Sequence, residues 1–596
     1  MDPLIKPYGG NLISLLAGEE RVAQLKLESR DLMSVVLSQR QLCDLELLMN
    51  GAYSPLSGFM TQEVYDGVVA DMRLPDGTLW PIPINFDVSA SIAEKLKPGM
   101  RLALHDEEGF MLAVLLVESV WQPDKKREAE LVYGTVSMVH PGVSYLFEQV
   151  GEVYVGGTLE GVQLPAHYDF ETLRDTPEEL RLLFNKHGWN RVVAFHISKP
   201  MHRLHLEITL NAAREAQANI LLHPAVGMTK PGDLNYYARV HCYKAILKHY
   251  PYSIAMLSLF PMAMRMAGPR EAILNAIIRQ NYGCSHFMVG LKHAEPPVLD
   301  EEGKRFYPPE SAQKLLERYQ EEMEIRLVKI PEYAYVPDEH RYMPVDEISR
   351  GNKQTTDFGQ RELVDCLARG LRAPSWYSFP EVINVLTKAS PPRSKQGITL
   401  FFTGLSGAGK STLAKIIFAK FIESGGRPVT LLDGDAVRHN LSSELGFSKA
   451  HRDLNVRRIG FVASEITKNG GVAICAPIAP YMSMRRSVRN MIKQHSAFIE
   501  IHVETSLEVC ESRDRKGLYA KARQGLIPEF TGISDPYEVP EHPELRINTA
   551  ELSPVQAAQQ IFLYLLSEGY LGASVSEEFD VTEMGGYFHF AEGRVG

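Results

Sequence analysis

Residues 398–412 read ITLFFTGLSGAGKST, and this stretch decides the fold class of the C-terminal third of the chain. Six mostly apolar residues come first, a run typical of a strand buried in a parallel sheet. The pattern GxxxxGK[ST] follows directly, and residues 413–422 continue with the periodicity of a helix. A strand, a glycine-rich turn and a helix in this order predict a phosphate-binding loop, in preference to a chance glycine-rich turn.

The glycine-rich loop has the composition that binding of a nucleoside triphosphate requires. Glycines let successive backbone N–H groups converge on phosphate oxygens, and the N-terminus of the following helix favours the anion. Lys410 is placed to reach the β- and γ-phosphates, and the hydroxyl of Ser411 is placed to ligate Mg²⁺. We therefore expect ATP with Mg²⁺ as the cofactor, bound by Gly404, Leu405, Ser406, Gly407, Ala408, Gly409, Lys410, Ser411 and Thr412.

Two carboxylates follow the next predicted strand, residues 429–432, in the sequence Asp-Gly-Asp at positions 433–435. Carboxylates at the C-terminal edge of a strand, one strand over from a phosphate-binding loop, can hold Mg²⁺ or accept a hydroxyl proton. A pair of aspartates in a surface turn is the alternative interpretation. We expect Asp435 and Lys410 to be catalytic, and Ser411 and Asp435 to be the metal ligands.

Basic and aromatic side chains follow the two carboxylates. Guanidinium groups can hold a dianion in a bidentate way, and an aromatic ring can stack on a base. Solvated charges on a helix surface are the plainer interpretation of the same residues. They are Arg438, Phe447, Arg452, Asn455, Arg457 and Arg458.

Several stretches of this C-terminal part resemble adenylyl-sulfate kinase, and the likeness covers about residues 396–570. The resemblance implies a parallel-sheet P-loop kinase that transfers the γ-phosphoryl group of ATP to the ribose 3′-hydroxyl of adenylyl sulfate. The product would be 3′-phosphoadenylyl sulfate (PAPS). A regulatory module that only binds PAPS is the alternative of another class, and it would predict a damaged loop. The matching stretches are LLDGDAVRHNLSSELGF (431–447), HRDLNVRRIGF (451–461), APIAPY (476–481), KGLYAKAR (516–523) and FTGISDPYEVP (530–540).

The resemblance also implies how the substrate is held. Two aromatic rings would enclose its adenine, three polar side chains would bind its phosphosulfate and ribose, and a lid over residues 514–540 would close over both nucleotides. Asp435 would assist the attacking hydroxyl. Ala479 stands where many relatives have a serine, so we expect direct in-line transfer. The implied substrate-binding residues are, in the same order, Phe447 and Phe530, then Arg438, Arg452 and Asn455, then Lys516 of the lid.

The first 390 residues fall into three parts by pattern. Short apolar runs separated by turn signals predict mostly β structure at the start, with a helix or two. Alternating strands and helices follow, as in a parallel α/β sheet, and a smaller mixed segment leads to a linker with two prolines. Predicted helices cover 176–187, the stretch up to 216, 236–249 and 269–281, and predicted strands 191–196, 219–223 and 286–289. The predicted domains are 1–170, 171–327, 328–390 and 391–570, with a peripheral tail over 571–596.

These 390 residues resemble ATP sulfurylase, which makes adenylyl sulfate from ATP and sulfate. Matching stretches are RQLCDLELLMNGAYSPLSGFM (40–60), HPAVGMTKPGD (223–233) and MRMAGPREA (264–272). The resemblance implies an N-terminal PUA-like domain, then a nucleotidyltransferase-like α/β domain with a small mixed subdomain. The order sulfurylase then kinase is itself a known fused arrangement.

Two anion-binding motifs of the sulfurylase family are altered in this chain. The family pattern Q-T-R-N-P-x-H-x-x-H reads HISKPMHRLH at 196–205, and G-R-D-H-A-G reads GLKHAE at 290–295. Each lost charged hydrogen bond costs about 1.5–3 kcal/mol, and Glu295 adds a negative charge near the expected anions. We therefore predict a weak or inactive sulfurylase half that serves as a scaffold. Its remaining family residues are His202, His205 and His293.

Other interpretations of this half stay open. Lys199 and Lys292 are new positive charges that would allow a shifted anion site and a fully bifunctional enzyme. His202 and His205, three positions apart, would share one helix face and could begin a metal site, although no third ligand is evident nearby. Contact with phosphate at a helix N-terminus is the simpler role for this pair.

Composition limits the remaining possibilities. With 73 acidic against 63 basic residues and a net charge of −10, we expect no general nucleic-acid binding. Apolar runs are too short to cross a bilayer, and six scattered cysteines suit a reducing cytoplasm. The expected partners are therefore ATP and adenylyl sulfate, with no membrane contact. The resemblance implies a homo-oligomer, commonly a hexamer.

Overall fold

The computed structural model describes residues 3–228, 234–351, 353–446, 448–514 and 516–571, so most of the expected tail lies outside it. The chain divides into two compact units. The first runs from the N-terminus to residue 359 and again over 373–389; the second contains 360–372 and everything from 390 onward. Within the described residues, no helix has both the length and the hydrophobicity needed to cross a membrane.

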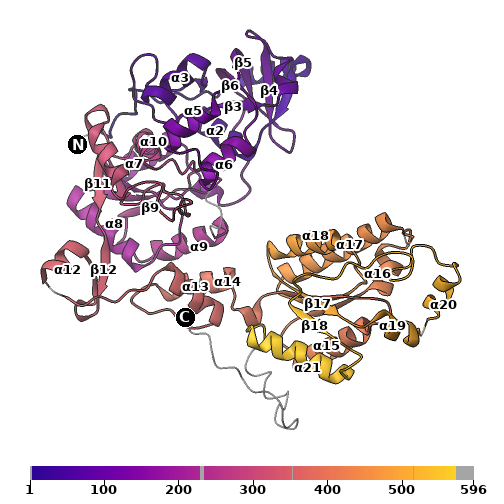
Figure 1. Ribbon diagram of the computed structural model, residues 1–596. Helices are drawn as coiled ribbons and strands as arrows, with labels where there is room; N and C mark the ends of the chain where they lie inside the picture. The colour runs from indigo at the N-terminus through magenta and orange to yellow at the C-terminus, as the bar shows by residue number, and fades with distance from the viewer. Residues whose placement is uncertain (1–2, 229–233, 352, 447, 515, 572–596) are drawn as a thin grey trace. The chain divides into compact units, whose positions relative to one another are not determined.

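The N-terminal part of the first unit is a mixed six-stranded sheet with helices around it (Figure 1). The strand order is β1-β4-β5-β6-β2, with β3 also paired to β6. The strands are β1 (Met33–Val36), β2 (Gly58–Phe59), β3 (Phe86–Val88), β4 (Arg101–His105), β5 (Met111–Trp121) and β6 (Val153–Gly161). The helices are α1 (Glu19–Glu28), α2 (Gln39–Met49), α3 (Gln62–Asp71), α4 (Ala90–Ala93), α5 (Lys125–Glu128) and α6 (Pro141–Glu148).

The helix content of this part is higher than the one or two helices predicted. Helix α2 begins with a reciprocal capping box between Ser38 and Gln41, which favours a helix start. Most of its residues are buried, polar and apolar alike, so its apolar residues do not form the one-sided stripe that marks a surface helix. The pattern of short apolar runs therefore did not give the bounds of this helix.

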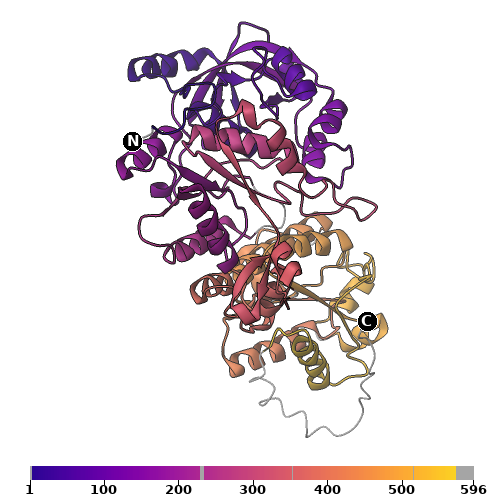
Figure 2. The same cartoon turned by 90° about the vertical axis from the view of Figure 1, so that its left-hand side faces the viewer.

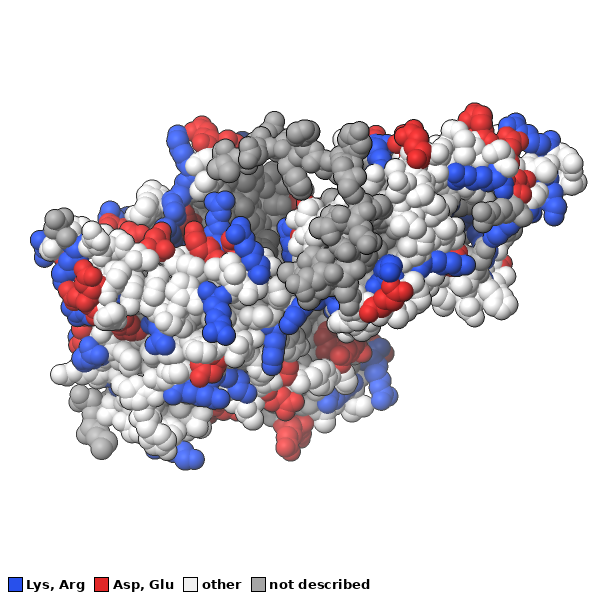
Figure 3. Space-filling view, turned by 90° about the horizontal axis from the view of Figure 1, so that it is seen from below, with Lys and Arg blue, Asp and Glu red and all other residues white. Residues whose placement is uncertain are grey.

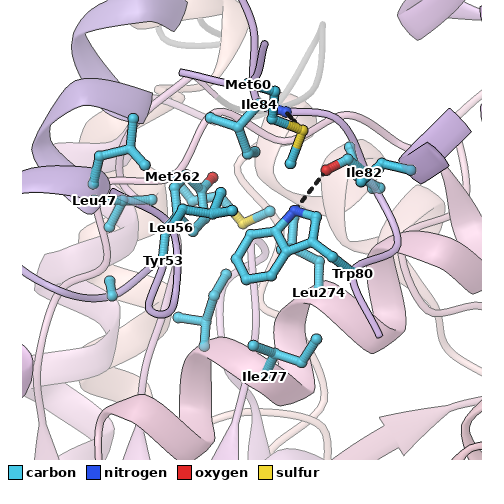
Figure 4. Close-up of a cluster of buried hydrophobic side chains, with 14 of the residues drawn as sticks. Leu47, Tyr53, Leu56, Met60, Trp80, Ile82, Ile84, Met262, Leu274 and Ile277 are labelled. Atoms are coloured by element: carbon cyan, nitrogen blue, oxygen red, sulfur yellow. Dashed lines mark hydrogen bonds between the residues drawn. The ribbon is translucent and has the colours of Figure 1, made fainter. Parts of the chain in front are cut away.

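One hydrophobic core joins this sheet to the α/β part of the same unit. Trp80 is fully buried, and its indole N–H donates to the carbonyl of Ile82 at 2.8 Å. Figure 4 shows Leu274 and Ile277 of α10 beside residues from the N-terminal part, such as Tyr53. The two parts of the first unit are thus packed as one body.

The α/β part is a five-stranded parallel sheet in the order β11-β10-β7-β8-β9, visible in Figure 2 behind its helices. Its predicted strands and helices are confirmed to within about three residues at each end. The strands are β7 (Val192–Phe195), β8 (Asn219–Leu222), β9 (Ala255–Leu257), β10 (His286–Gly290) and β11 (Arg326–Ile330). The helices are α7 (Pro177–His187), α8 (Arg203–Ala216), α9 (Tyr236–Leu247), α10 (Gly268–Asn281) and α11 (Ser311–Arg318).

A short mixed segment follows this sheet, as its pattern predicted. An antiparallel pair, β12 with β13, is followed by three helices, of which α13 groups with the second unit and α14 with the first. The elements are β12 (Tyr333–Val336), β13 (Arg341–Pro344), α12 (Val345–Gly351), α13 (Gln360–Arg369) and α14 (Pro380–Ala389).

The second unit contains an all-parallel sheet in the order β15-β16-β14-β17-β18. Strand β14 has the predicted bounds, and its successive residues face opposite sides of the sheet. Leu400 packs in the core cluster with α15 and α21, whereas Phe401 packs in the one with α17 and α18. Helices therefore cover both faces, as expected for a parallel sheet. The strands are β14 (Ile398–Thr403), β15 (Val429–Asp433), β16 (Val472–Ala476), β17 (Ala497–Val503) and β18 (Leu545–Ile547). The helices are α15 (Lys410–Ser424), α16 (Gly434–Leu441), α17 (Lys449–Lys468), α18 (Met482–Lys493), α19 (Leu507–Arg513), α20 (Leu518–Arg523) and α21 (Pro554–Ser567).

Charged side chains of both signs are interspersed over the face shown in Figure 3.

Candidate functional sites

The glycine-rich loop joins β14 to the N-terminus of α15, as the sequence pattern predicts. Gly407 has φ +77° and Gly409, the residue before α15, has φ +105°, both in the region that side chains disfavour. A β-carbon on Gly407 would lie 3.0 Å from the carbonyl oxygen of Cys510. The backbone path of the loop therefore depends on these glycines.

Residues far along the chain hold the loop in place. The hydroxyl of Tyr519 donates to the carbonyl of Ser406 at 2.8 Å, and that of Thr549 donates to the carbonyl of Ala408 at 2.8 Å. Arg513 donates in turn to the Thr549 hydroxyl and carbonyl, both at 2.8 Å. Sequence reasoning missed these supports because nothing in a local pattern marks a contact over a hundred residues away.

Lys410 is buried, and its ammonium group donates to the carbonyls of Gly404 and Leu405 at 2.9 and 2.7 Å. Burial lowers the pKa of Lys410 to about 8, while nearby acidic groups such as Asp433 act to raise it. The ammonium group of Lys410 is thus hydrogen-bonded to two carbonyls of the loop that we expect to bind the phosphates. A bound phosphate would replace weak dipolar partners by a full negative charge.

The Asp-Gly-Asp stretch lies where β15 ends and α16 begins. Strand β16 lies between β14 and β15, so the carboxylates are two strands from the loop and not one. The chain crosses through α16 and α17 before β16 fills the gap. The side chain of Asp435 lies outside the described residues. Ser411 is exposed in the first turn of α15, and Asp433 is close enough to influence Lys410. The Ser411 hydroxyl and the Asp433 carboxylate are oxygen groups of the kind that a hard cation such as Mg²⁺ prefers.

Two of the expected substrate residues, Arg452 and Asn455, lie on the buried side of α17. Arg452 donates to Thr531 Oγ1 at 2.8 Å, to Asp535 Oδ2 at 2.6 Å and to the Tyr481 hydroxyl at 3.1 Å. Its Nε and the Oδ1 of Asn455 are buried and have no hydrogen-bond partner within the described residues. A donor and an acceptor are thus available for a polar ligand, since buried polar atoms are normally satisfied.

For the other expected substrate residues that the structure describes, it shows no unpaired buried polar atom of the kind found at Arg452 and Asn455. Arg438 donates to the carbonyls of Leu445 and Gly446, so it supports the segment that leads to Phe447. Phe447 itself lies outside the described residues. Phe530 packs edge-on against Tyr519 with ring centroids 5.0 Å apart, and Lys516 is exposed.

Ala479 stands in a constrained position after β16. Its φ is +46°, and its carbonyl accepts from Arg485 at 2.8 Å and from the Thr403 hydroxyl at 3.2 Å. The side chain is buried. The structure thus gives the backbone of this residue, and not a side-chain hydroxyl, the hydrogen-bonding role.

The two altered motifs of the first unit meet at one edge of its sheet. One follows β7 and the other follows β10, and these strands are parallel neighbours. The chain leaves β7 towards β8 on one side and β10 towards β11 on the other. Such a divergence point, at the carboxyl ends of parallel strands, is the usual place for a ligand.

A buried arginine occupies the middle of this edge. Arg279 is fully buried, and it donates to His196 Nδ1 at 2.7 Å and to Asn275 Oδ1 at 2.8 Å. Since arginine only donates, His196 Nδ1 must be the acceptor. Burial lowers the pKa of Arg279 to about 10. The ring of His293 lies 5.6 Å from that of His196, and its Nε2 is 3.3 Å from Asn275 Nδ2.

The histidine pair lies at the start of α8. His202 precedes the helix, and its backbone N–H donates to His205 Nδ1 at 2.9 Å. The proton of the neutral His205 ring must therefore be on Nε2, which makes that atom a donor. Burial lowers the pKa of His202 to about 3 and that of His205 to about 4, so both rings are neutral at pH 7. No cluster of three metal-ligating side chains was found among the described residues, so a metal at this pair gains no support.

The remaining altered positions change the expected electrostatics. Glu295 pairs with Arg305 at 2.8 Å, so the repulsion expected from this carboxylate is reduced by its partner. Lys199 and Lys292, one in each of the two motifs, are exposed. Ser198 and Leu291 leave the places of the family's two arginines without charge.

Comparisons with known proteins agree with both resemblances. Family models match over 5–164 (PUA-like domain), 171–389 (ATP-sulfurylase) and 396–548 (Adenylylsulphate kinase). A sulfate adenylyltransferase of Emericella nidulans is 48% identical over 569 residues, which is 95% of this chain and 99% of that protein. One of Gibberella zeae is 47% identical over 569 residues, again 95% of this chain and 99% of that protein. A hexameric APS kinase from Thiobacillus denitrificans has a TM-score of 0.78 at 42% identity, covering 96% of this chain and 100% of that one.

These relatives do not support the prediction of a weak or inactive sulfurylase half. The curated proteins carry the name sulfate adenylyltransferase and align over nearly their whole length. They favour the alternative, in which both halves are active. The altered charges remain a physical difference that an assay has to resolve.

Proposed function

Since this chain belongs to the family of fused ATP-sulfurylase and adenylylsulphate kinase proteins, we propose that it is a bifunctional enzyme of sulfate activation. Its first unit would join sulfate to the adenylyl group of ATP and release pyrophosphate. Its second unit would phosphorylate the adenylyl sulfate so formed at the ribose 3′-hydroxyl. We further propose a cytoplasmic enzyme, with the domain division predicted from the sequence.

The observation that carries the kinase activity is the buried Lys410 at the start of α15, next to a loop whose glycines have positive φ. In the proposed reaction the 3′-hydroxyl oxygen bonds to the γ-phosphorus of ATP as the bond to the leaving ADP oxygen breaks. Asp435 accepts the hydroxyl proton, and Lys410 offsets negative charge on the transferred group. Mg²⁺ bound with ATP, near Ser411 and Asp435, would neutralise phosphate charge.

The remaining groups of the second unit would position adenylyl sulfate. Arg452 Nε and Asn455 Oδ1 offer one donor and one acceptor from a single helix. Phe530 and Phe447 supply the aromatic surfaces for the adenine, with Arg438 and Lys516 adding positive charge. Alignment of the two nucleotides is the main contribution that a kinase makes.

Replacing the lysine tests the kinase assignment. Lys410→Ala should reduce ATP-dependent phosphorylation of adenylyl sulfate by at least a hundredfold, as expected for loss of a charged transition-state contact. Lys415→Ala, on the exposed side of the same helix, is the matched control and should keep full activity. Full activity in Lys410→Ala would refute the assignment.

For the sulfurylase activity, support comes from the names of the full-length relatives and from the surviving histidine pair. A sulfate oxygen would attack the α-phosphorus of ATP as the bond to pyrophosphate breaks. The Nε2–H of His205 is a neutral donor at a helix N-terminus, suited to phosphate oxygens. Lys199 and Lys292 are the nearby positive charges.

A specific observation favours a second candidate, a kinase whose first unit does not turn over. His196 is bound to Arg279, and Ser198 and Leu291 carry no charge where the family has arginine. The Thiobacillus denitrificans relative is described only as an APS kinase. Assays of pyrophosphate release from ATP and sulfate, and of ATP formation in reverse, separate the candidates. Turnover in either direction supports the bifunctional enzyme, and none in both supports the kinase alone.

We also propose that the chain forms a homo-oligomer, with a hexamer as the expected size. The hexameric relative that aligns over 100% of its length supports this. Light scattering coupled to size exclusion should give a mass about six times 66.8 kDa. A monomeric mass would contradict the proposal.

A further inference from the structure

A short strap crosses the start of α8 in the first unit. The backbone N–H of Arg203 donates to the carbonyl of Tyr377 at 3.1 Å, and its Nε donates to the carbonyl of Ser375 at 2.7 Å. The guanidinium of Arg203 also lies 4.2 Å from the ring centroid of Phe379. The strap, residues 375–379, thus satisfies part of a helix N-terminus that would otherwise need water.

The side chain of Ser378 makes the most specific contact of the strap. Its Oγ lies 2.9 Å from Nδ1 of His202, and both residues are buried, with 2% and 6% of their surface exposed. The ring of Tyr377 lies 4.5 Å from that of His202. A buried ring with one nitrogen bonded and one face covered has a fixed orientation.

His202 is also held through its backbone. Its N–H donates to His205 Nδ1, so both histidines of the pair share one rigid arrangement. With Nδ1 of His202 bonded to Ser378, Nε2 is the ring nitrogen that remains to contact a ligand. A hydrogen bond from a neighbouring residue, such as the one between Ser378 and His202, orients a side chain that contacts the substrate.

We propose that Ser378 is a positioning residue for the sulfurylase reaction: it holds Nδ1 of His202 and thereby directs Nε2 towards the phosphates of the nucleotide. This inference rests on the proposed sulfurylase activity of the first unit. Ser378 lies 176 residues from His202 in the chain, next to α14 and close to the linker, and no sequence motif connects the two residues.

The test compares three variants of the full chain. Ser378→Ala removes the hydroxyl and should lower kcat for ATP formation from adenylyl sulfate and pyrophosphate about fivefold, with KM nearly unchanged. Ser378→Thr retains the hydroxyl and should recover most of the rate. Ser375→Ala, in the same strap, keeps the backbone carbonyl that Arg203 uses and should match the parent protein. Since kinase activity reports on the second unit only, the thermal transition of the first unit in each variant, compared with that of the parent protein, reports correct folding.

A second measurement needs no turnover. Deuterium exchange at the imidazole C2 position, followed by mass spectrometry, reports on each histidine separately. Exchange at His202 should change in Ser378→Ala and stay unchanged in Ser378→Thr and Ser375→Ala. The same His202 exchange in Ser378→Ala and the parent protein would overturn the inference, as would equal kcat in both.

The two failures are distinguishable. A parent protein without sulfurylase turnover in either direction would refute the proposed function of the first unit. An active parent protein with an equally active Ser378→Ala variant would refute the positioning role alone.

Discussion

Arg452 shows how a single residue combines a structural and a binding role. Its Nη groups bond Thr531, Tyr481 and Asp535, whereas its Nε is buried and has no hydrogen-bond partner within the described residues. These three hydrogen-bond partners lie between 29 and 83 residues from Arg452 in the chain. The orientation of the guanidinium is therefore set by the FTGISDPYEVP stretch and the residue after APIAP.

We predict that Asp535→Asn weakens binding of adenylyl sulfate. The asparagine keeps the shape but removes the charge that fixes Arg452, so KM for adenylyl sulfate should rise about tenfold, which corresponds to about 1.4 kcal/mol. Asp453→Asn breaks an exposed pair with Arg457 on the same helix and is the matched control. Steady-state kinetics measure both, and equal KM values in the two variants would contradict the prediction.

The titration of Lys410 gives a second prediction at this scale. Burial lowers its pKa to about 8 in the free protein, and ATP needs the protonated form. The dissociation constant for ATP should therefore rise above pH 8, approaching tenfold per pH unit. Lys410→Met should bind ATP weakly and lose this dependence. Calorimetric titrations between pH 7 and 9.5 measure it; an affinity independent of pH in the parent protein would be the contrary result.

The same shift affects stability in the opposite direction. Because the pKa of Lys410 lies below its usual 10.5 in the folded protein, the unfolded chain binds more protons between about pH 8 and 10.5. The contribution of this lysine to the free energy of unfolding thus rises with pH across that window. Below pH 8 it is constant, since the lysine is protonated in both states.

At the scale of elements, the sequence was most informative where local patterns and tertiary structure agree. Strand β14 and the loop were predicted with their bounds because a buried parallel strand is apolar throughout and the loop needs glycines. Helix α2 was not delimited, because it is buried on nearly all sides and shows no one-sided apolar stripe. The position of β16 between β14 and β15 is a property of chain crossover, which no local pattern records.

In the candidate sites, too, local patterns marked some residues, whereas the contacts that depend on tertiary structure stayed hidden. Among the candidate residues, Lys410 and Ser411 were named from motif spacing, and the pair His202 and His205 from the family resemblance. Their supports could not be found in this way, since Thr549 lies 141 residues from the loop carbonyl that it bonds. Glu295 was expected to repel anions because its partner Arg305, ten residues on, has no pattern that marks it.

A glycine stands at each end of α15, and replacing each by alanine gives a pair of variants whose effects can be compared. Gly409→Ala would place a β-carbon 3.2 Å from Thr549 Cγ2 at φ +105°, so both stability and ATP binding should fall. Gly425, at the other end, has open space around it but a backbone conformation (φ +64°, ψ −163°) that is almost exclusive to glycine, so Gly425→Ala should lower stability while ATP binding stays unchanged. Urea unfolding and ATP titration of both variants test this. Unchanged ATP binding in Gly409→Ala would show that the loop tolerates the side chain.

At the scale of the whole molecule, each unit has a hydrophobic core of its own. The first is built around Trp80, and the second has one core on each face of its parallel sheet. Residues 373–389 belong to the first unit although their neighbours in the chain on both sides group with the second. Units with separate cores are expected to unfold separately unless their contact is large.

We therefore predict two thermal transitions, of which one responds to the kinase product. ADP with Mg²⁺ at a hundred times its dissociation constant should stabilise the second unit by about 2.7 kcal/mol. For a unit of this size the midpoint should rise by roughly 5–10 °C. Differential scanning calorimetry of the parent protein and of Lys410→Ala measures the shift, which the variant should lose. The other transition should stay in place in both proteins, since ADP is neither substrate nor product of the proposed sulfurylase reaction. A single transition that shifts with ADP would mean that the two units unfold cooperatively. An equal shift of both transitions in Lys410→Ala would mean that ADP binds outside the loop.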